Sequence, residues 1–297
     1  MEGEQTLQQV ALEGCRDELK DKEVYQRLAR SFKDKNHMYS QIFNELADTE
    51  QKHYSFWTKY CPTEKAQPSK FQIWLILFLR YIFGVTFAIK LLESHETKTI
   101  EKYKSVSHMI PDEDRSKFEE MLSDEVDHEK RFRDQVQSSY IKYISFVILG
   151  LADAIVEISG IHAGSLGIYN STEITGLAGV VAGAAASIAM ASAAYAQAKQ
   201  GFAGSASVSA FFTGISYFVS AVILASPYFL TKEMVIAIVV SLILGIAIVG
   251  TTTYYNSIIS ETKFLRDFAE LVAIMLAATA VLYLFGEGIR IFTGIRI

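Results

Sequence analysis

Charged residues are abundant up to residue 138 and scarce after it, and this change constrains the fold more than any other feature. Residues 1–138 contain 21 of the 28 Lys and Arg residues and 25 of the 33 Asp and Glu residues of the 297-residue chain, which leaves 7 and 8 for residues 139–297. A water-soluble domain does not tolerate so few charges, whereas a membrane domain requires them to be rare. The sequence therefore predicts a charged helical domain, 1–138, followed by a membrane domain, 139–297.

The second part contains five apolar stretches, each long enough to cross a hydrocarbon core of roughly 30 Å as a helix. They cover residues 141–165, 174–198, 206–228, 234–253 and 268–288. The spacings Gly160-x3-Gly164 and Gly179-x3-Gly183 predict close helix packing. Five spans put the two chain ends on opposite sides of the membrane. More of the Lys and Arg residues next to the spans fall on the side of the N-terminus than on the other side. This predicts a multi-pass cell-membrane protein with a cytoplasmic N-terminal domain, and the polar N-terminus predicts no cleavable signal peptide.

The first part contains two Glu-x-x-His pairs in matching contexts. Glu50 and His53 form one pair, and Glu125 and His128 form the other, 75 positions later. A phenylalanine precedes each of these glutamates by seven positions. Positions three apart share a face of a helix, so each pair can offer a carboxylate and an imidazole to one metal ion.

One further glutamate upstream of each pair completes the repeat. Glu18 is followed seven residues later by Tyr25, and Glu96 is followed seven residues later by Tyr103. Each glutamate precedes its pair by about thirty residues, the length of half a helix, a turn and half of the next helix. These Glu and His residues could instead lie on solvent-exposed helix faces. Their recurrence favours a duplicated helical hairpin, in which each copy supplies half of a two-metal site. The predicted ligands are Glu18, Glu50, His53, Glu96, Glu125 and His128.

Oxygen and nitrogen donors of this kind suit two iron or manganese ions rather than thiolate-bound copper or zinc. Such a centre can reduce oxygen or peroxide while oxidising iron, or it can act as a loaded sensor. The only cysteines, Cys15 and Cys61, lack Cys-x-x-Cys spacing, which excludes a rubredoxin-type iron centre and argues against a disulfide framework. The net charge of −5 indicates no nucleic-acid partner.

The membrane part carries its own acidic pair. Asp153 and Glu157 lie four residues apart on one face of the first span. A carboxylate in hydrocarbon is costly, so the pair is expected to face a transport pathway rather than anchor the helix among headgroups. Met190 in the second span is either a soft ligand or an ordinary core residue.

Other polar residues of the spans are harder to assign. His162 is about half a turn out of phase with Asp153, so it is not expected to join the acidic pair. Glu270 opens the fifth span, where an interfacial role and a transport role are both open. The run 251–253 and Asn256 are expected to end the fourth span as caps.

Residues 71–92 are apolar enough to cross a membrane, although they include Arg80 and Lys90. A crossing here would put the two halves of the metal site on opposite sides of the membrane. The segment is therefore interpreted as the first half of the third bundle helix, lying on the membrane surface or buried in a dimer contact.

Residues 141–297 resemble the vacuolar iron transporter family, five-span proteins that carry ferrous iron and manganese. Residues 150–154 resemble the family's first-helix Gly-x-x-Asp-Gly, and residues 188–195 resemble its second-helix Ser-Met-x-x-Gly-x-Tyr. Further matches lie at 212–217, 268–270 and 294–295. The resemblance implies transport at Asp153 and Met190 and a homodimer with the pathway at its axis.

Residues 1–138 resemble the rubrerythrin branch of the ferritin superfamily. The fusion of both parts is similar to prokaryotic membrane-bound ferritin-like proteins, which are regarded as iron exporters. The expected fold is all-α: a ferritin-like four-helix bundle with two iron (or manganese) ions, followed by a five-helix transmembrane domain in contact with lipid.

The chain also departs from the eukaryotic transporters. Their acid-rich segment between spans two and three is replaced by the short connection 197–205, and one acid before the first-helix Asp is replaced by Phe146. Their second-helix acid has no counterpart in 177–180. The N-terminal bundle is expected to take over metal capture, and Glu157 is a candidate substitute for a missing acid.

Three functions fit these features. The first is a transporter that exports Fe²⁺ or Mn²⁺ from the cytoplasm by proton antiport, with the bundle capturing, sensing or oxidising iron. The second is a membrane-anchored di-iron ferroxidase or peroxidase, and the third is a di-iron quinone or lipid oxidase. Asp153 and Glu157 favour transport, because a simple anchor does not need them.

Overall fold

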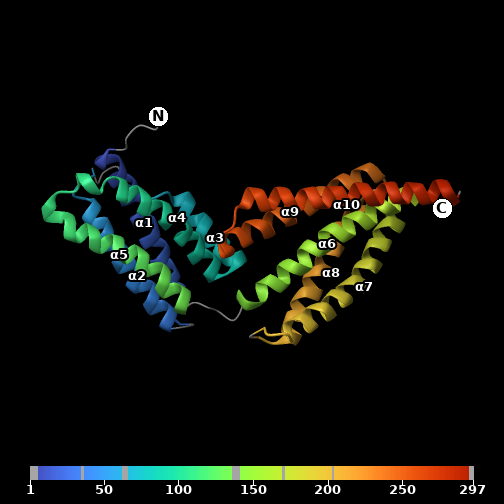
Figure 1. Ribbon diagram of the computed structural model, residues 1–297, viewed down its shortest axis with the longest axis horizontal. Helices are drawn as coiled ribbons and strands as arrows, with labels where there is room; N and C mark the ends of the chain where they lie inside the picture. Colours follow the sequence, from blue (N-terminus) through green and yellow to red (C-terminus); the bar gives the residue numbers. More distant parts are fainter. Residues whose placement is uncertain are drawn as a thin grey trace. The chain divides into compact units, whose positions relative to one another are not determined.

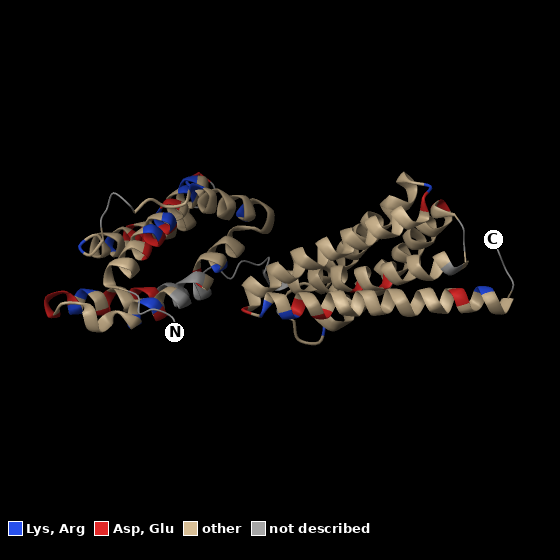
Figure 2. Ribbon diagram, turned by 90° about the horizontal axis from the view of Figure 1, so that it is seen from above, with Lys and Arg blue, Asp and Glu red and all other residues tan. Residues whose placement is uncertain are grey.

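The structure is a computed structural model in which every regular element of the described residues is a helix, which confirms the predicted all-α class. It describes residues 6–34, 37–61, 66–135, 141–168, 171–202 and 204–293, with side chains at all of these except 95–98, 126–135, 141–142 and 167. The chain divides into two compact units, Met1–Gln137 and Ser138–Ile297. Figure 2 shows charged residues spread over the helices of the first unit and few along those of the second.

Four long helices of the first unit form a bundle (Figure 1). They are α1 (Leu7–Phe32), α2 (His37–Trp57), α4 (Val85–Ser105) and α5 (Asp112–Gln135). Helix α1 begins in a capping box, in which Thr6 and Gln9 satisfy each other's backbone N–H groups. It packs along α2 and contacts α4, while α5 contacts both α2 and α4. This arrangement buries the described ligand positions of α1, α2 and α5 in the interior of the bundle.

The apolar segment 71–92 is not one continuous helix, so that expectation was wrong. Helix α3 (Lys70–Phe83) ends at Gly84, whose φ of 90° lies outside the range of a right-handed helix, and α4 begins at Val85. Glycine tolerates this backbone conformation because it lacks a Cβ. The chain bends there, and α3 packs against α1 and α4 while exposing an aromatic stripe. The exposed stripe includes Phe71, Trp74, Phe78 and Tyr81.

The second unit consists of five long helices (Figure 1). They are α6 (Ile141–Ile168), α7 (Thr172–Ala198), α8 (Ala206–Leu230), α9 (Met234–Ser260) and α10 (Phe264–Thr293). All five are long and apolar enough to cross a membrane, as the sequence predicted. Helix α6 contacts each of the other four, and α7 lies along α8. Helix α6 is therefore the element that links the others in this unit, although part of its surface, including Glu157, stays exposed.

Small residues allow the close crossings predicted by the glycine spacings. A Cβ placed on Gly160 would come within 2.3 Å of Leu282 on α10, and one on Gly183 would come within 2.5 Å of Ala221 on α8. Gly179 makes room for the His162 ring in the same way. These contacts confirm that the glycines permit close helix packing.

The fourth span is longer than expected, which corrects the capping role given to 251–253 and Asn256. Helix α9 continues to Ser260 and ends at Glu261, which adopts a left-handed conformation. The hydroxyls of Thr251, Thr252 and Thr253 donate to carbonyl groups one turn earlier in the same helix. Such bonds satisfy threonine inside a continuing helix, so these residues lie within α9 rather than at its cap.

Candidate metal centre

The structure brings four of the six predicted ligands together inside the bundle. Each of Glu18 on α1, Glu50 and His53 on α2, and Glu125 on α5 offers one donor atom, and these atoms lie within 4.8 Å of one another. The four residues are only 2–3% exposed. Buried carboxylates and imidazoles are rare unless they are paired or bind a metal.

The imidazole of His53 lies at the centre of this group. Its Nδ1 is 3.1 Å from Glu125 Oε1, 3.6 Å from Glu50 Oε2 and 3.7 Å from Glu18 Oε2. The Glu50 contact joins positions three apart on α2, as the Glu-x-x-His spacing predicts. Three carboxylates and one imidazole from three helices thus converge within the reach of one or two metal ions.

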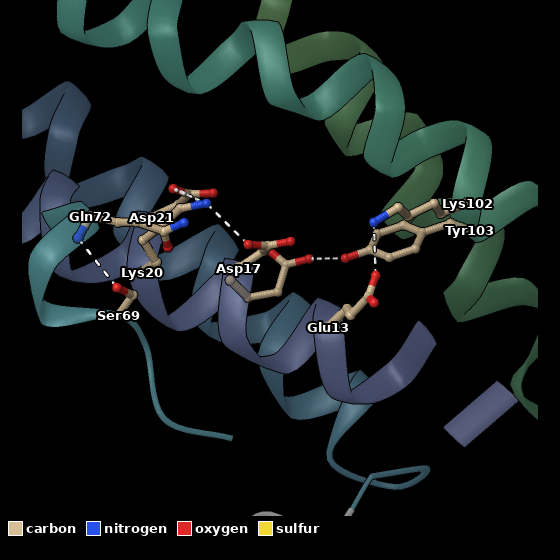
Figure 3. Close-up of polar contacts among 9 residues, drawn as sticks. Glu13, Asp17, Lys20, Asp21, Ser69, Gln72, Lys102 and Tyr103 are labelled. Atoms are coloured by element: carbon tan, nitrogen blue, oxygen red, sulfur yellow. Dashed lines mark hydrogen bonds and ion pairs between the residues drawn. The ribbon is translucent and has the colours of Figure 1, made fainter. Parts of the chain in front are cut away.

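A tyrosine of α4 contributes a hydrogen bond that was not predicted. Tyr103 had been recognised only as a marker of the repeat, but its buried hydroxyl donates to Glu18 Oε1 at 2.7 Å. The neighbouring Lys102 ammonium donates to Glu13 Oε2 at 2.7 Å. Figure 3 shows Tyr103 and Lys102 reaching from α4 toward α1. A hydroxyl that holds one carboxylate oxygen orients the other toward the cluster.

Burial and mutual repulsion determine the protonation of the cluster. Burial, together with the charges of Glu18 and its neighbours, raises the pKa values of Glu50 and Glu125 above their usual range, although His53 opposes this. Burial also acts to raise the pKa of Glu18, but hydrogen bonding to His53 and its charge lower it overall. The His53 pKa is raised because the three carboxylates outweigh its burial. The metal-free centre therefore holds protons that a cation would displace.

Two acids near the cluster were missed from the sequence. Asp124 Oδ2 lies 3.5 Å from His53 Nε2, on the far side of the imidazole from the three glutamates. Asp21 lies one turn beyond Glu18 on α1, and burial and nearby carboxylates raise its pKa to about 7, even though Lys20 lowers it. Asp124 precedes Glu125 directly, whereas Thr49 precedes Glu50, and this difference between the repeats is the one signal that could have identified it.

A cavity of about 390 Å³ reaches the centre from the surface between α2 and α5. Its lining includes His53 and Asp124 as well as three lysines. The lysines are Lys52, Lys59 and Lys117. A cavity of this size admits water, a metal ion, oxygen or peroxide, so the centre is accessible although its ligands are buried.

The remaining two predicted ligands lie on the expected helices. Glu96 is in α4 and His128 is in α5, but their side chains lie outside the described residues. The donor set that is described suits iron or manganese, because it consists of carboxylate oxygen and imidazole nitrogen without thiolate. The residues present thus fit a two-metal centre.

In the membrane unit, the predicted acidic pair meets a tyrosine. Tyr217 on α8 is fully buried, and its hydroxyl donates to Glu157 Oε2 at 2.6 Å. Asp153 is half-buried one turn earlier on α6, whereas Glu157 is exposed within a single chain. Met190 is half-buried on α7 and packs against the apolar cluster that contains Tyr217. The tyrosine was not predicted as a partner.

The structure also places two other polar residues of the membrane unit, His162 and Glu270, whose roles the sequence did not assign. His162 is 1% exposed and lies against Tyr228, with ring centroids 4.3 Å apart, so it packs in the helix core away from the acidic pair. Glu270 is exposed on α10 and, with Asp267 and Asn256, lines a cavity of about 240 Å³ beside α6 and α9. This placement leaves both roles considered for Glu270 open.

Comparison with known protein families gives a match within the first unit. Residues 12–136 match the rubrerythrin family model. The search of curated proteins and the search of solved structures gave no match. The fold and the buried cluster thus define a ferritin-like domain capable of holding a metal centre, followed in the described residues by five helices long and apolar enough to cross a membrane.

Proposed function

We propose that this protein is a membrane transporter that exports Fe²⁺, or Mn²⁺, from the cytoplasm in exchange for protons. The observation that carries the proposal is the joining, in one chain, of a buried carboxylate–imidazole cluster to a membrane unit with an acidic pair in its central helix. A helix that served only as an anchor would not need Asp153 and Glu157 in its middle. The resemblance of this unit to the vacuolar iron transporters supports the same function.

In the bundle, Glu18, Glu50, Glu125 and His53, with Glu96 and His128, would hold two iron or manganese ions. Such a centre supplies redox chemistry toward oxygen or peroxide when bound. The chain itself buries the donors, holds Glu18 through the Tyr103 hydroxyl and leaves an opening beside His53. These features suit a domain that captures cytoplasmic metal from an N-terminal, cytoplasmic position.

In the membrane unit, Asp153 and Glu157 would bind the transported ion, with Met190 as a softer contact. The Tyr217 hydroxyl holds Glu157 in position. Protonation of the carboxylates from the acidic side would neutralise their charge and release the cation, which couples export to proton entry. Because Glu157 is exposed in one chain, a second copy facing α6 would cover it, and this supports a homodimer with the pathway at its axis.

The decisive experiment measures Fe²⁺ and Mn²⁺ flux in proteoliposomes with an imposed pH gradient. Asp153→Ala is expected to lower the flux to background while the bundle still binds metal. Glu173→Ala, which removes an exposed acid at the start of α7, is the matched control and is expected to transport normally. Unchanged flux in Asp153→Ala would contradict the proposal.

A second function is favoured by one observation. The cavity beside His53 gives oxygen or peroxide a route to the centre, as a membrane-anchored ferroxidase or peroxidase requires. Full-length Glu50→Ala separates the two functions. If it abolishes oxygen or peroxide consumption while Asp153→Ala leaves flux unchanged, the enzyme is the better description. If flux survives in Glu50→Ala, the bundle regulates transport without being an obligatory relay.

A further inference from the structure

The two cysteines of the chain meet in the core of the bundle. Cys15 lies on α1 and Cys61 follows the end of α2, so they are 46 positions apart in the sequence. Both are buried in one apolar cluster, with exposures of 0% and 8%. Both thiols are free and buried, and they pack within this same cluster. A meeting of this kind was not expected, since the spacing of the cysteines indicates neither a metal ribbon nor a disulfide framework.

The thiol pair lies next to the metal centre. Cys15 is one helical turn before the ligand Glu18 on α1, close enough for the charge of Glu18 to act on its thiol. The cluster that contains the cysteines also contains two oxidisable aromatic side chains, Trp57 and Tyr103, whose ring centroids are 4.6 Å apart. Tyr103 donates its hydroxyl to Glu18, so this aromatic pair ends at a ligand.

Gly14 allows this arrangement. A Cβ at this position would lie 2.9 Å from the Tyr103 hydroxyl and 3.0 Å from Trp57 Cδ1 and Nε1. Both side chains therefore press directly on the backbone of α1 beside Cys15. Trp57 and Tyr103 are also almost fully buried. The thiols and both aromatic rings thus share one packed cluster, and the Tyr103 hydroxyl links this cluster to Glu18.

We propose that Cys15 and Cys61 are a redox pair that donates two electrons toward the metal centre for the reduction of a peroxide and closes into an intramolecular disulfide. Each thiol gives up one proton and one electron, and a sulfur–sulfur bond forms. The oxygen–oxygen bond of hydrogen peroxide breaks, and its two oxygen atoms leave as two water molecules. A small dithiol restores the pair by thiol–disulfide exchange.

The surroundings of the pair favour this indirect route over direct attack on peroxide. Burial and the neighbouring acidic groups raise the pKa of Cys15, so its thiol stays protonated. A protonated thiol is a poor nucleophile, which keeps the pair reduced until an oxidised metal centre is present. The inference rests on the proposed metal centre, and it supplies the electron source that a chain without a rubredoxin-type centre otherwise lacks.

The test uses the full-length protein in detergent, with and without Fe²⁺ loaded in the absence of oxygen. One equivalent of hydrogen peroxide is added, the reaction is stopped with acid, and free thiols are alkylated after denaturation and counted by mass spectrometry. Both thiols are expected to disappear together, with the loss of two hydrogen atoms per chain. The reaction should be about tenfold faster or more in the metal-loaded protein, because the protonated thiols react slowly by themselves.

Variants separate the parts of the proposal. Cys61→Ser should form no intramolecular disulfide while its metal content is unchanged, and Trp57→Phe should slow thiol loss at unchanged metal content. Diamide, a thiol oxidant, should close the disulfide in the metal-free protein, and it reports on the pair independently of the metal. If diamide did not form the disulfide between Cys15 and Cys61, the proposal that they are a redox pair would be wrong. Equal rates of peroxide-driven thiol loss with and without metal would overturn the route to the centre, and a protein that takes up no metal would overturn both that route and the proposed function.

Discussion

The two acidic sites of this chain differ in how completely a single copy encloses them. In the bundle, Glu18, Glu50 and Glu125 are 3%, 2% and 3% exposed, and three helices surround them. In the membrane unit, Asp153 is half-buried and Glu157 is exposed. Each site nevertheless contains a buried tyrosine that donates to one of its carboxylates.

This difference indicates different tasks. A site enclosed by one chain can retain a metal, because its ligands stay in place when the metal leaves. A site that is open on one side within a membrane needs a second copy or a water-filled path to cover its charge. The bundle therefore suits capture, and the acidic pair suits passage.

The largest expected effect is the loss of metal from the bundle in Glu50→Ala. Removing one of the buried donors should weaken metal binding by about 100-fold or more, since even loss of an outer partner of a ligand costs up to that amount. Metal content after dialysis checks this. Glu45→Ala changes an exposed glutamate of the same helix and should leave metal content unchanged. Equal metal content in the two variants would show that the cluster is not the metal site.

Metal binding to the bundle should weaken as pH falls. The raised pKa values of Glu50 and Glu125 keep these groups protonated in the metal-free protein, so a metal ion must displace their protons. Affinity should then fall by about tenfold per pH unit for each proton released. Calorimetry in buffers of different ionisation enthalpy counts these protons. Affinity that did not change with pH would mean that the carboxylates are already ionised.

Replacing Tyr103 should affect only the metal centre, and replacing Tyr217 should affect only the acidic pair in the membrane unit. Tyr103→Phe removes a donor to Glu18 and should weaken metal binding by about tenfold. Tyr217→Phe removes a donor to Glu157 and should lower flux severalfold while bundle metal content is unchanged. Metal titration and proteoliposome flux, measured on both variants, show whether the sites are independent.

A third tyrosine is the matched control. Tyr60 donates to Asp114 at 2.6 Å, away from the metal ligands. Tyr60→Phe should lower the free energy of unfolding slightly without affecting metal binding or flux. If it weakened metal binding as much as Tyr103→Phe, general destabilisation would explain both results.

The smallest expected effect concerns α3, the helix that does not belong to either site. Its exposed Trp74 should be quenched by brominated lipids if the aromatic stripe lies on the membrane surface. Replacing the buried Trp57 by Phe leaves Trp74 as the only tryptophan. If the lipids did not quench Trp74 and its emission depended on protein concentration, the aromatic stripe would lie in a dimer contact instead.

Particular residues show how far the sequence could be interpreted. The duplicated Glu-x-x-His spacing identified three side chains that do meet, Glu50, His53 and Glu125, because residues three apart on a helix share a face wherever the helix lies. The fourth, Glu18, was identified by the upstream glutamate of the repeat. Apolar length identified all five membrane helices, because backbone groups in hydrocarbon must be satisfied within the helix. The helix break at Gly84 was missed because an apolar run has the same composition whether it is straight or bent.

The sequence alone determined the helical class, the two-part organisation and the residues on each helix that can face a metal, since these follow from local periodicity and composition. Only the tertiary structure decided which side chains from distant helices meet. The bond from Tyr103 to Glu18, that from Tyr217 to Glu157, and the packing of Cys15 and Cys61 in one buried cluster all join residues far apart in the chain. Such contacts depend on how helices pack in three dimensions, and no spacing along the chain specifies them.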